Sequence, residues 1–192
     1  MILKIRQVGE PALRQFARPL SRDEILSTHI QELIVAMRET MRDAPGVGLA
    51  APQIGMPLQI AVIEDRQEYI DRLPPGQAAE RGRAAVPFQV IVNPGIAIES
   101  AEDHDQVPFF EGCLSLAGYT AIVPRAKKVR VECLNEKAEP VTIEADGWYA
   151  RILQHEIDHL HGKLYIDRMM PGSFMTLDNF TRYGKDFPQG DR

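Results

Sequence analysis

The chain has 192 residues, a length that favours one domain over two, so we expect residues 1–192 to fold as a single domain. A formal net charge of −5, from 22 basic and 27 acidic residues, argues against direct binding to DNA or another phosphate backbone. No apolar run approaches the ~20 residues that a membrane span requires. With 44% apolar and 26% charged residues, the composition is that of a folded, soluble protein.

The cysteines and the first residues indicate the compartment. Cys113 and Cys133 lie in different sequence settings and cannot form a disulfide framework. Residues 1–10 alternate charged with apolar side chains and lack the long apolar stretch and the small-residue cleavage site of a secretion signal. We therefore expect a cytoplasmic protein.

Near the N-terminus, the stretch from Ser27 to Arg42 has helical spacing. Its apolar residues recur at intervals of three and four, at Ile30, Leu33, Ile34, Met37 and Met41. This pattern predicts an amphipathic helix that packs against the core.

The middle of the chain predicts short strands. Apolar, β-branched or alternating patterns mark Leu58 to Glu64, Val90 to Val92, Ile96 to Ile98 and Lys128 to Leu134. Between the first two, Asp65 to Pro87 is rich in charge, proline, glycine and alanine, and we interpret it as an exposed surface insertion with a short helix at residues 68–73.

Helical character returns from Trp148 to Leu164, with Gly162 as a stop signal. A helix, several short strands and a second helix, in that order, predict an α+β fold. We expect mostly antiparallel short strands that surround this central C-terminal helix, together with the N-terminal helix.

The segment from Gln154 to Leu160 reads QHEIDHL and contains an HExxH motif. Residues four apart on a helix are separated by about 400° of rotation, so His155 and His159 can converge on one metal ion. Glu156 can then reach a metal-bound water without binding the metal, which suits a general base that later acts as a general acid. The alternative, two surface histidines on a polar helix, is disfavoured by the apolar residues around them.

A catalytic site of this kind has three protein ligands and one open position. The usual protease patterns do not supply the third ligand, because Tyr165 stands where a metzincin has its histidine and no glutamate follows Glu156. Cys113, within the sequence EGCLS, is the candidate: a thiolate with two imidazoles leaves one tetrahedral corner for water. A buried core thiol is the alternative interpretation of a lone cysteine.

A third segment, from Gly46 to Gly55, reads GVGLAAPQIG. Its small residues would let the backbone of a substrate approach closely, and Gln53 offers an amide donor. The segment does not end in Lys followed by Ser or Thr, so it is not a phosphate-binding loop.

With GVGLAAPQIG, EGCLS and QHEIDHL in this order, the chain resembles the peptide deformylases over about residues 40–170. The sequence GWYAR at residues 147–151 is similar to the organellar type and its bacterial relatives, that is, type 1. The resemblance implies a metal-dependent hydrolase that removes the N-formyl group from the initiator methionine of new polypeptides and releases formate. Its implied partners are N-formylmethionyl peptides and nascent chains near the ribosome.

By the same resemblance, one divalent cation is held by Cys113, His155 and His159, while Glu156 transfers the proton. The native metal implied is Fe²⁺, and Zn²⁺, Ni²⁺ or Co²⁺ can replace it in preparations. Charge on the formyl oxygen would be stabilised by the side-chain amide of Gln53 and the backbone N–H of Leu114.

The resemblance also implies a substrate groove. Val47, Trp148 and Ile152 are the candidates for the wall of an apolar pocket that takes the methionine side chain. Gly48 and Gly112 would leave room for main-chain hydrogen bonds to an extended peptide.

Other readings of the same motifs remain open. An HExxH metallopeptidase with an unusual cysteine ligand would cleave internal peptide bonds instead of a formamide. A structural metal site would need a fourth protein ligand, for which Cys133 is the only remaining thiol. A member of the family that has lost catalysis would keep the fold, but Glu156 and Gln53 are both present.

Overall fold

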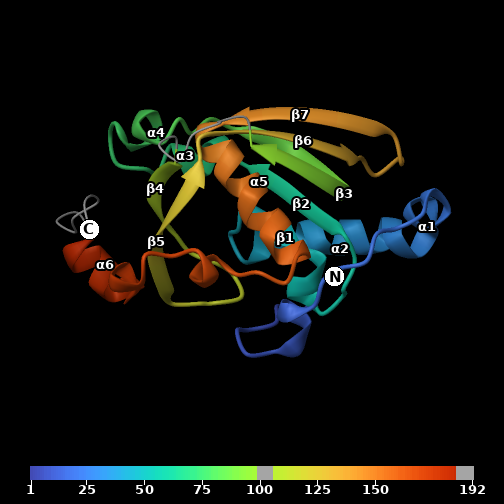
Figure 1. The fold of residues 1–192 in the computed structure, drawn as a ribbon, viewed down its shortest axis with the longest axis horizontal. Coiled ribbons are helices and arrows are strands. Elements are labelled where there is room, and N and C mark those ends of the chain that lie inside the picture. The colour runs from blue at the N-terminus through green and yellow to red at the C-terminus, as the bar shows by residue number, and fades with distance from the viewer. Residues whose placement is uncertain (99–105, 185–192) are drawn as a thin grey trace.

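The computed structural model describes residues 1–98 and 106–184, and it confirms the predicted α+β fold (Figure 1). Helices α1 and α6 lie at opposite ends of the long axis of the molecule, and helix α5 crosses its centre. The helices of the described residues are α1 (Arg22–Leu26), α2 (Thr28–Asp43), α3 (Gln67–Ile70), α4 (Gln77–Glu80), α5 (Gly147–Leu160) and α6 (Leu177–Tyr183). None of them combines the length and the apolar composition that crossing a bilayer demands.

The strands form two antiparallel sheets. The larger has the order β1-β2-β3-β6-β7, and the smaller has the order β4-β5-β8. Strand β1 is therefore at one edge of the larger sheet, and β4 is at one edge of the smaller sheet. Their bounds are β1 (Gly48–Ala50), β2 (Ile60–Asp65), β3 (Val86–Ile98), β4 (Gln106–Glu111), β5 (Tyr119–Ala126), β6 (Lys128–Leu134), β7 (Pro140–Asp146) and β8 (Met175–Thr176).

The two long helices pack against the larger sheet through two separate apolar clusters. Alternation along β2 divides its side chains: Val62 packs in the cluster of α2, whereas Ile63 packs in the cluster of α5. Helix α2 begins after Ser27, whose side-chain oxygen accepts a hydrogen bond from the backbone N–H of Ile30, and this helix is the one predicted from the apolar spacing. Helix α5 contacts strands of both sheets, so its polar residues lie where the two sheets meet.

Two predicted boundaries were wrong. Helix α5 ends at Leu160 rather than at Leu164, because the chain turns at His161 and Gly162 takes a positive φ of 69°. The two short strands predicted on either side of residues 93–95 are one strand, β3. The break is a register shift between Val92 and Gly95, which Asn93 accommodates with a φ of 51°.

The predicted surface insertion, Asp65 to Pro87, is only partly exposed. Asp65 belongs to β2 and is buried, and its carboxylate accepts hydrogen bonds of 2.7 and 2.8 Å from Arg83. This ion pair ties the two ends of the segment together. The segment contains the short helices α3 and α4 and returns to the sheet at Val86.

Candidate metal centre

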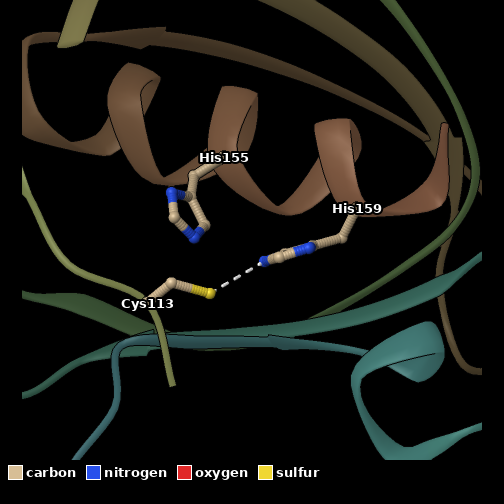
Figure 2. A group of neighbouring side chains, drawn as sticks. All are labelled: Cys113, His155 and His159. Atoms are coloured by element: carbon tan, nitrogen blue, oxygen red, sulfur yellow. Dashed lines mark hydrogen bonds between the residues drawn. The ribbon is translucent and has the colours of Figure 1, made fainter. Parts of the chain in front are cut away.

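The structure brings the three predicted ligands together. Cys113 follows the end of β4, and His155 and His159 project from the same face of α5 toward it (Figure 2). One ligand atom from each residue lies within 4.8 Å of the other two, and the Cys113 Sγ to His159 Nε2 distance is 3.3 Å. Within the part of the chain that the structure describes, this group has no fourth member, and Cys133 packs instead among apolar residues of β6 and α5.

Glu111 orients one of the imidazoles. Its Oε2 atom lies 3.0 Å from Nδ1 of His155, which leaves Nε2 as the ring nitrogen available to a metal. The carboxylate is buried, and it accepts hydrogen bonds of 3.0 Å from both Arg125 Nε and Arg125 Nη2 and of 2.6 Å from Arg151 Nη1. Burial alone would raise its pKa, but Arg125 and His155 hold the pKa of Glu111 well below its usual value. It is therefore a fixed negative charge behind His155.

The same network continues along α5 through Asp158. Its carboxylate pairs with Arg125 and accepts hydrogen bonds of 2.7 and 2.8 Å from Arg168. Among the described residues, no hydrogen bond joins the carboxylate of Asp158 to His155 or His159. It holds Arg125 in place, whereas Glu111 connects Arg125 to the imidazole.

Replacing Glu111 by Gln is expected to weaken metal binding. Removing a carboxylate partner of a ligating histidine typically costs about 10- to 100-fold in metal affinity, because the ring loses its fixed orientation and part of its basicity. The measurement is a competition titration against a chelator, with Zn²⁺ as the metal. Asp158→Asn is the matched control: it also removes a buried carboxylate from Arg125, so it should lower stability without an equal loss of affinity. An unchanged affinity in folded Glu111→Gln would contradict the role of Glu111.

Glu156 lies beside the group in an unusual environment. The residue is 4% exposed, and its Oε2 atom has no hydrogen-bond partner among the described residues. Burial raises the pKa of Glu156 to about 7, and His155 opposes part of that shift. A carboxyl with such a pKa can both accept and release a proton at neutral pH.

Gln53 is fixed on the other side of the group. It belongs to a short 3-10 helix, Ala51–Ile54, and its Oε1 atom accepts a hydrogen bond of 2.8 Å from the backbone N–H of Ala50. This contact turns its Nε2 atom toward Cys113 Sγ, at 3.5 Å, and Ser115 Oγ, at 3.2 Å. The amide donor therefore faces the candidate ligands.

A cavity of about 1170 Å³ opens next to these residues. The predicted catalytic residues Gln53, Leu114 and Glu156 line it. So do all the predicted substrate-binding residues, namely Val47, Gly48, Gly112, Trp148 and Ile152. His159 is not in its lining and is almost fully buried. The segment interpreted as a surface insertion also lines the cavity, through residues that include Leu73, Arg81 and Arg83.

Sequence reasoning missed the buried charges around the ligands. The EGCLS sequence contains Glu111 but gives it no role, and Arg125 belongs to none of the three motifs. A signal was present, because each is a charged residue at the end of a strongly apolar strand, β4 or β5, where a charge needs a partner.

The residues present fit a divalent transition metal. One soft thiolate and two imidazoles are a donor set for Zn, Fe or Ni, and they would supply three protein ligands to such an ion. Nδ1 of His155 is hydrogen-bonded to Glu111, which leaves Nε2 of this ring as the donor for a metal. Nε2 of His155 and Nε2 of His159 both point toward Cys113 (Figure 2).

Comparison with known proteins gives consistent matches. The family model described as polypeptide deformylase matches residues 2–174. The chain is 43% identical over 175 residues to the chloroplastic peptide deformylase 1A of Solanum lycopersicum, and 40% identical over 168 residues to the mitochondrial peptide deformylase of Homo sapiens. These alignments cover 91% and 88% of this chain, and 62% and 68% of the two relatives. The chain thus spans less than two thirds of the length of the plant relative.

Solved structures show the same likeness. The Met-Ala-Ser-bound class I type b peptide deformylase from Acinetobacter baumannii has 33% sequence identity and a TM-score of 0.76, over 88% of this chain and 99% of that chain. A peptide deformylase from Ehrlichia chaffeensis has 32% identity and a TM-score of 0.74, over 88% of both chains.

Proposed function

This chain belongs to the polypeptide deformylase family, with type 1 deformylases among its relatives, and we propose that it removes the N-formyl group from the N-terminal formylmethionine of new polypeptides. The observation that carries the proposal is the meeting of Cys113, His155 and His159, beside a buried glutamate and at the wall of a cavity. We also propose that residues 1–192 form one domain, that the protein acts in the cytoplasm, and that it meets its substrates as nascent chains near the ribosome.

Cys113, His155 and His159 would hold the metal, for which we propose Fe²⁺ as the native ion, with Zn²⁺, Ni²⁺ or Co²⁺ as possible substitutes. A divalent cation at such a site polarises a carbonyl group and lowers the pKa of water to near 7. Glu111 keeps the ring of His155 in the orientation that exposes Nε2.

Glu156 is the group that moves the proton. Its carboxylate takes a proton from the attacking water, and its carboxylic acid then gives that proton to the leaving amine. In the metal-free protein, burial raises the pKa of Glu156 to about 7, which favours the protonated form that later releases the proton.

Two donors would stabilise the negative charge that develops on the formyl oxygen. They are the Nε2 amide of Gln53, which already faces Cys113, and the backbone N–H of Leu114. Removal of one donor of this kind costs about 2.7–4 kcal/mol in other hydrolases.

The substrate groove lies between two sheet edges. Gly48 of the edge strand β1 and residues that follow the edge strand β4 line the same cavity, so an extended peptide can add its backbone to either edge. Val47, Trp148 and Ile152 would form the apolar wall for the methionine side chain, and Gly48 and Gly112 would leave room for the peptide backbone.

Gly48 gives the first test of this arrangement. A Cβ atom at residue 48 would lie 2.2 Å from Glu156 Oε1 and 2.5 Å from its Cδ, so Gly48→Ala must displace the carboxyl group. A shift of about 1 Å in a catalytic group can cost on the order of 100-fold in rate, and we expect a loss of that size in kcat. Gly172→Ala is the control, because its Cβ would meet nothing within 4 Å. Normal turnover by Gly48→Ala would contradict the position given to Glu156.

The main alternative is an HExxH metallopeptidase with a cysteine ligand. Formyl-Met-Ala-Ser separates the two activities, with formate measured enzymatically and peptide fragments measured by mass spectrometry on the same reaction. The proposed function predicts formate and intact Met-Ala-Ser. Cleavage of an internal peptide bond without release of formate would establish the alternative.

A further inference from the structure

Three guanidinium groups surround the side chain of Trp148 at one end of the cavity. The guanidinium carbons of Arg81, Arg83 and Arg151 lie 4.9, 5.4 and 5.7 Å from the centre of its ring. Arg83 is paired with Asp65, and Arg151 is paired with Glu111. Arg81 forms no ion pair with residues 1–98 or 106–184, and the acid that acts on its charge among them is the neighbouring Glu80.

Arg81 is held in this position by its backbone. The N-terminus of α5 packs directly on residues 81 and 82: a Cβ atom at Gly147 would lie 2.7 Å from the carbonyl oxygen of Gly82 and 3.1 Å from that of Arg81. The side chain of Arg81 then stacks on Trp148 and lies over Phe109, at 5.8 Å. It is half-buried, and burial and the nearby Arg83 lower its pKa, whereas Glu80 acts in the opposite direction.

The surroundings of Arg81 favour an anion. Arg81 also lines a smaller adjoining cavity of about 310 Å³. The charged residues in the lining of that cavity are four cations and one acid, namely Arg81, Arg125, Lys127, Arg151 and Glu80. Arg125 and Arg151 are ion-paired, but their positive charges still repel that of Arg81. The negative charge of a carboxylate bound here would offset this repulsion.

For an extended substrate that runs along α5 from His155 toward Trp148, the spacing of these two residues gives the substrate position that reaches Arg81. Trp148 and His155 are seven residues apart on α5, which is about 10 Å at 1.5 Å per residue. An extended peptide advances about 3.3 Å per residue, so this distance corresponds to roughly three residues. The first and third side chains of an extended peptide point to the same face, so a third side chain faces the wall that takes the methionine.

We propose that Arg81 makes this protein prefer formylated peptides with an acidic side chain at the third residue, whose carboxylate pairs with the Arg81 guanidinium. The proposal rests on the proposed deformylase function, because it places the formyl group at Cys113, His155 and His159. It assigns the segment between β2 and β3 a role in choosing the substrate.

The test compares formyl-Met-Ala-Glu-amide with formyl-Met-Ala-Gln-amide. The two peptides have nearly the same shape, and the amide removes the C-terminal carboxylate that would otherwise compete for Arg81. For the metal-loaded protein we expect kcat/KM to be about threefold higher for the Glu peptide, the size of a partly exposed ion pair, and the ratio to fall as salt rises. In Arg81→Gln the ratio should fall to about one.

Arg72→Gln is the matched control. It removes the same charge from the same segment, but Arg72 is exposed and lines neither cavity, so the Glu-to-Gln ratio should stay at its original value. A ratio of one in the unchanged protein, or a raised ratio that survives Arg81→Gln, would overturn the proposal. So would a preference confined to formyl-Met-Glu-Ala-amide, which carries the acid at the second residue.

A binding measurement separates this proposal from the proposed function. Trp148 is the only tryptophan of the chain, so its fluorescence reports on binding at this end of the cavity. Met-Ala-Glu-amide should bind the metal-loaded protein about threefold more tightly than Met-Ala-Gln-amide, and Arg81→Gln should abolish the difference. Failure to deformylate any peptide would overturn the proposed function, while the binding ratio would still decide the role of Arg81.

Discussion

Cys113→Ala is expected to lose its metal and, with it, formate release. Removing one of three protein ligands should weaken metal affinity by more than about 100-fold, since loss of a group that merely supports a ligand already costs about 10- to 100-fold. Among residues 1–98 and 106–184, no further His, Cys, Asp or Glu joins this group of ligands to take over the position. The measurement is metal content by mass spectrometry after gel filtration, together with formate release from formyl-Met-Ala-Ser.

Cys133→Ala is the matched control for that variant. Burial raises the pKa of the Cys133 thiol to about 11, and its side chain packs among apolar residues rather than among the ligands. This variant should keep both its metal and its activity. Full metal occupancy in Cys113→Ala, or loss of metal in Cys133→Ala, would contradict the assignment of the ligands and would favour a structural metal site.

Glu156→Gln should abolish turnover while it leaves the metal in place. A positioned general acid–base contributes about 100- to 10,000-fold to the rate, and glutamine cannot move a proton. Glutamine has nearly the same shape, so it still fits against Gly48, and the three ligands are untouched. The expected result is kcat reduced by a factor in that range with one metal ion per chain. A variant with near-normal kcat would show that another group transfers the proton.

The same variant has a second readout, which is stability against pH in the metal-free protein. Burial raises the pKa of Glu156 from 4.5 to about 7, so the folded state binds more protons than the unfolded state between these values. Its contribution to stability is therefore fully present below pH about 4.5 and is lost as pH rises through about 7. Thermal unfolding should show this loss in the unchanged protein and a smaller loss in Glu156→Gln. Parallel curves would contradict the buried environment of the carboxyl group.

Those parts of the site that depend on local spacing could be predicted from the sequence. The interval of four residues between His155 and His159 is enough to place two imidazoles on one face of a helix. The apolar spacing within Ser27 to Arg42 likewise predicted α2. The position of Cys113 opposite α5 could not follow from spacing, because it depends on how β5 packs on the helix and how β4 pairs with β5. It was inferred from a missing ligand and from the family resemblance.

The parts that local patterns could not predict are set by tertiary contacts. Asn93 marks a turn in the sequence, but pairing with β6 on both sides of it keeps β3 continuous. The composition of Asp65 to Pro87 is typical of a loop, and nothing in it shows that Arg83 pairs with Asp65 or that Arg81 stacks on Trp148. Glu111 likewise acquires its contact with His155 only when β4 meets α5.

The central claim is that Cys113, His155 and His159 hold one metal ion on which deformylation depends. The direct test is to add Fe²⁺ to the metal-free protein without oxygen, in steps from zero to two equivalents, and to measure bound metal and formate release on each sample. Formate release from formyl-Met-Ala-Ser is expected to rise in proportion to bound metal and to level off at one ion per chain. Formate release that does not change with metal content, or a fully loaded protein that releases none, would contradict it.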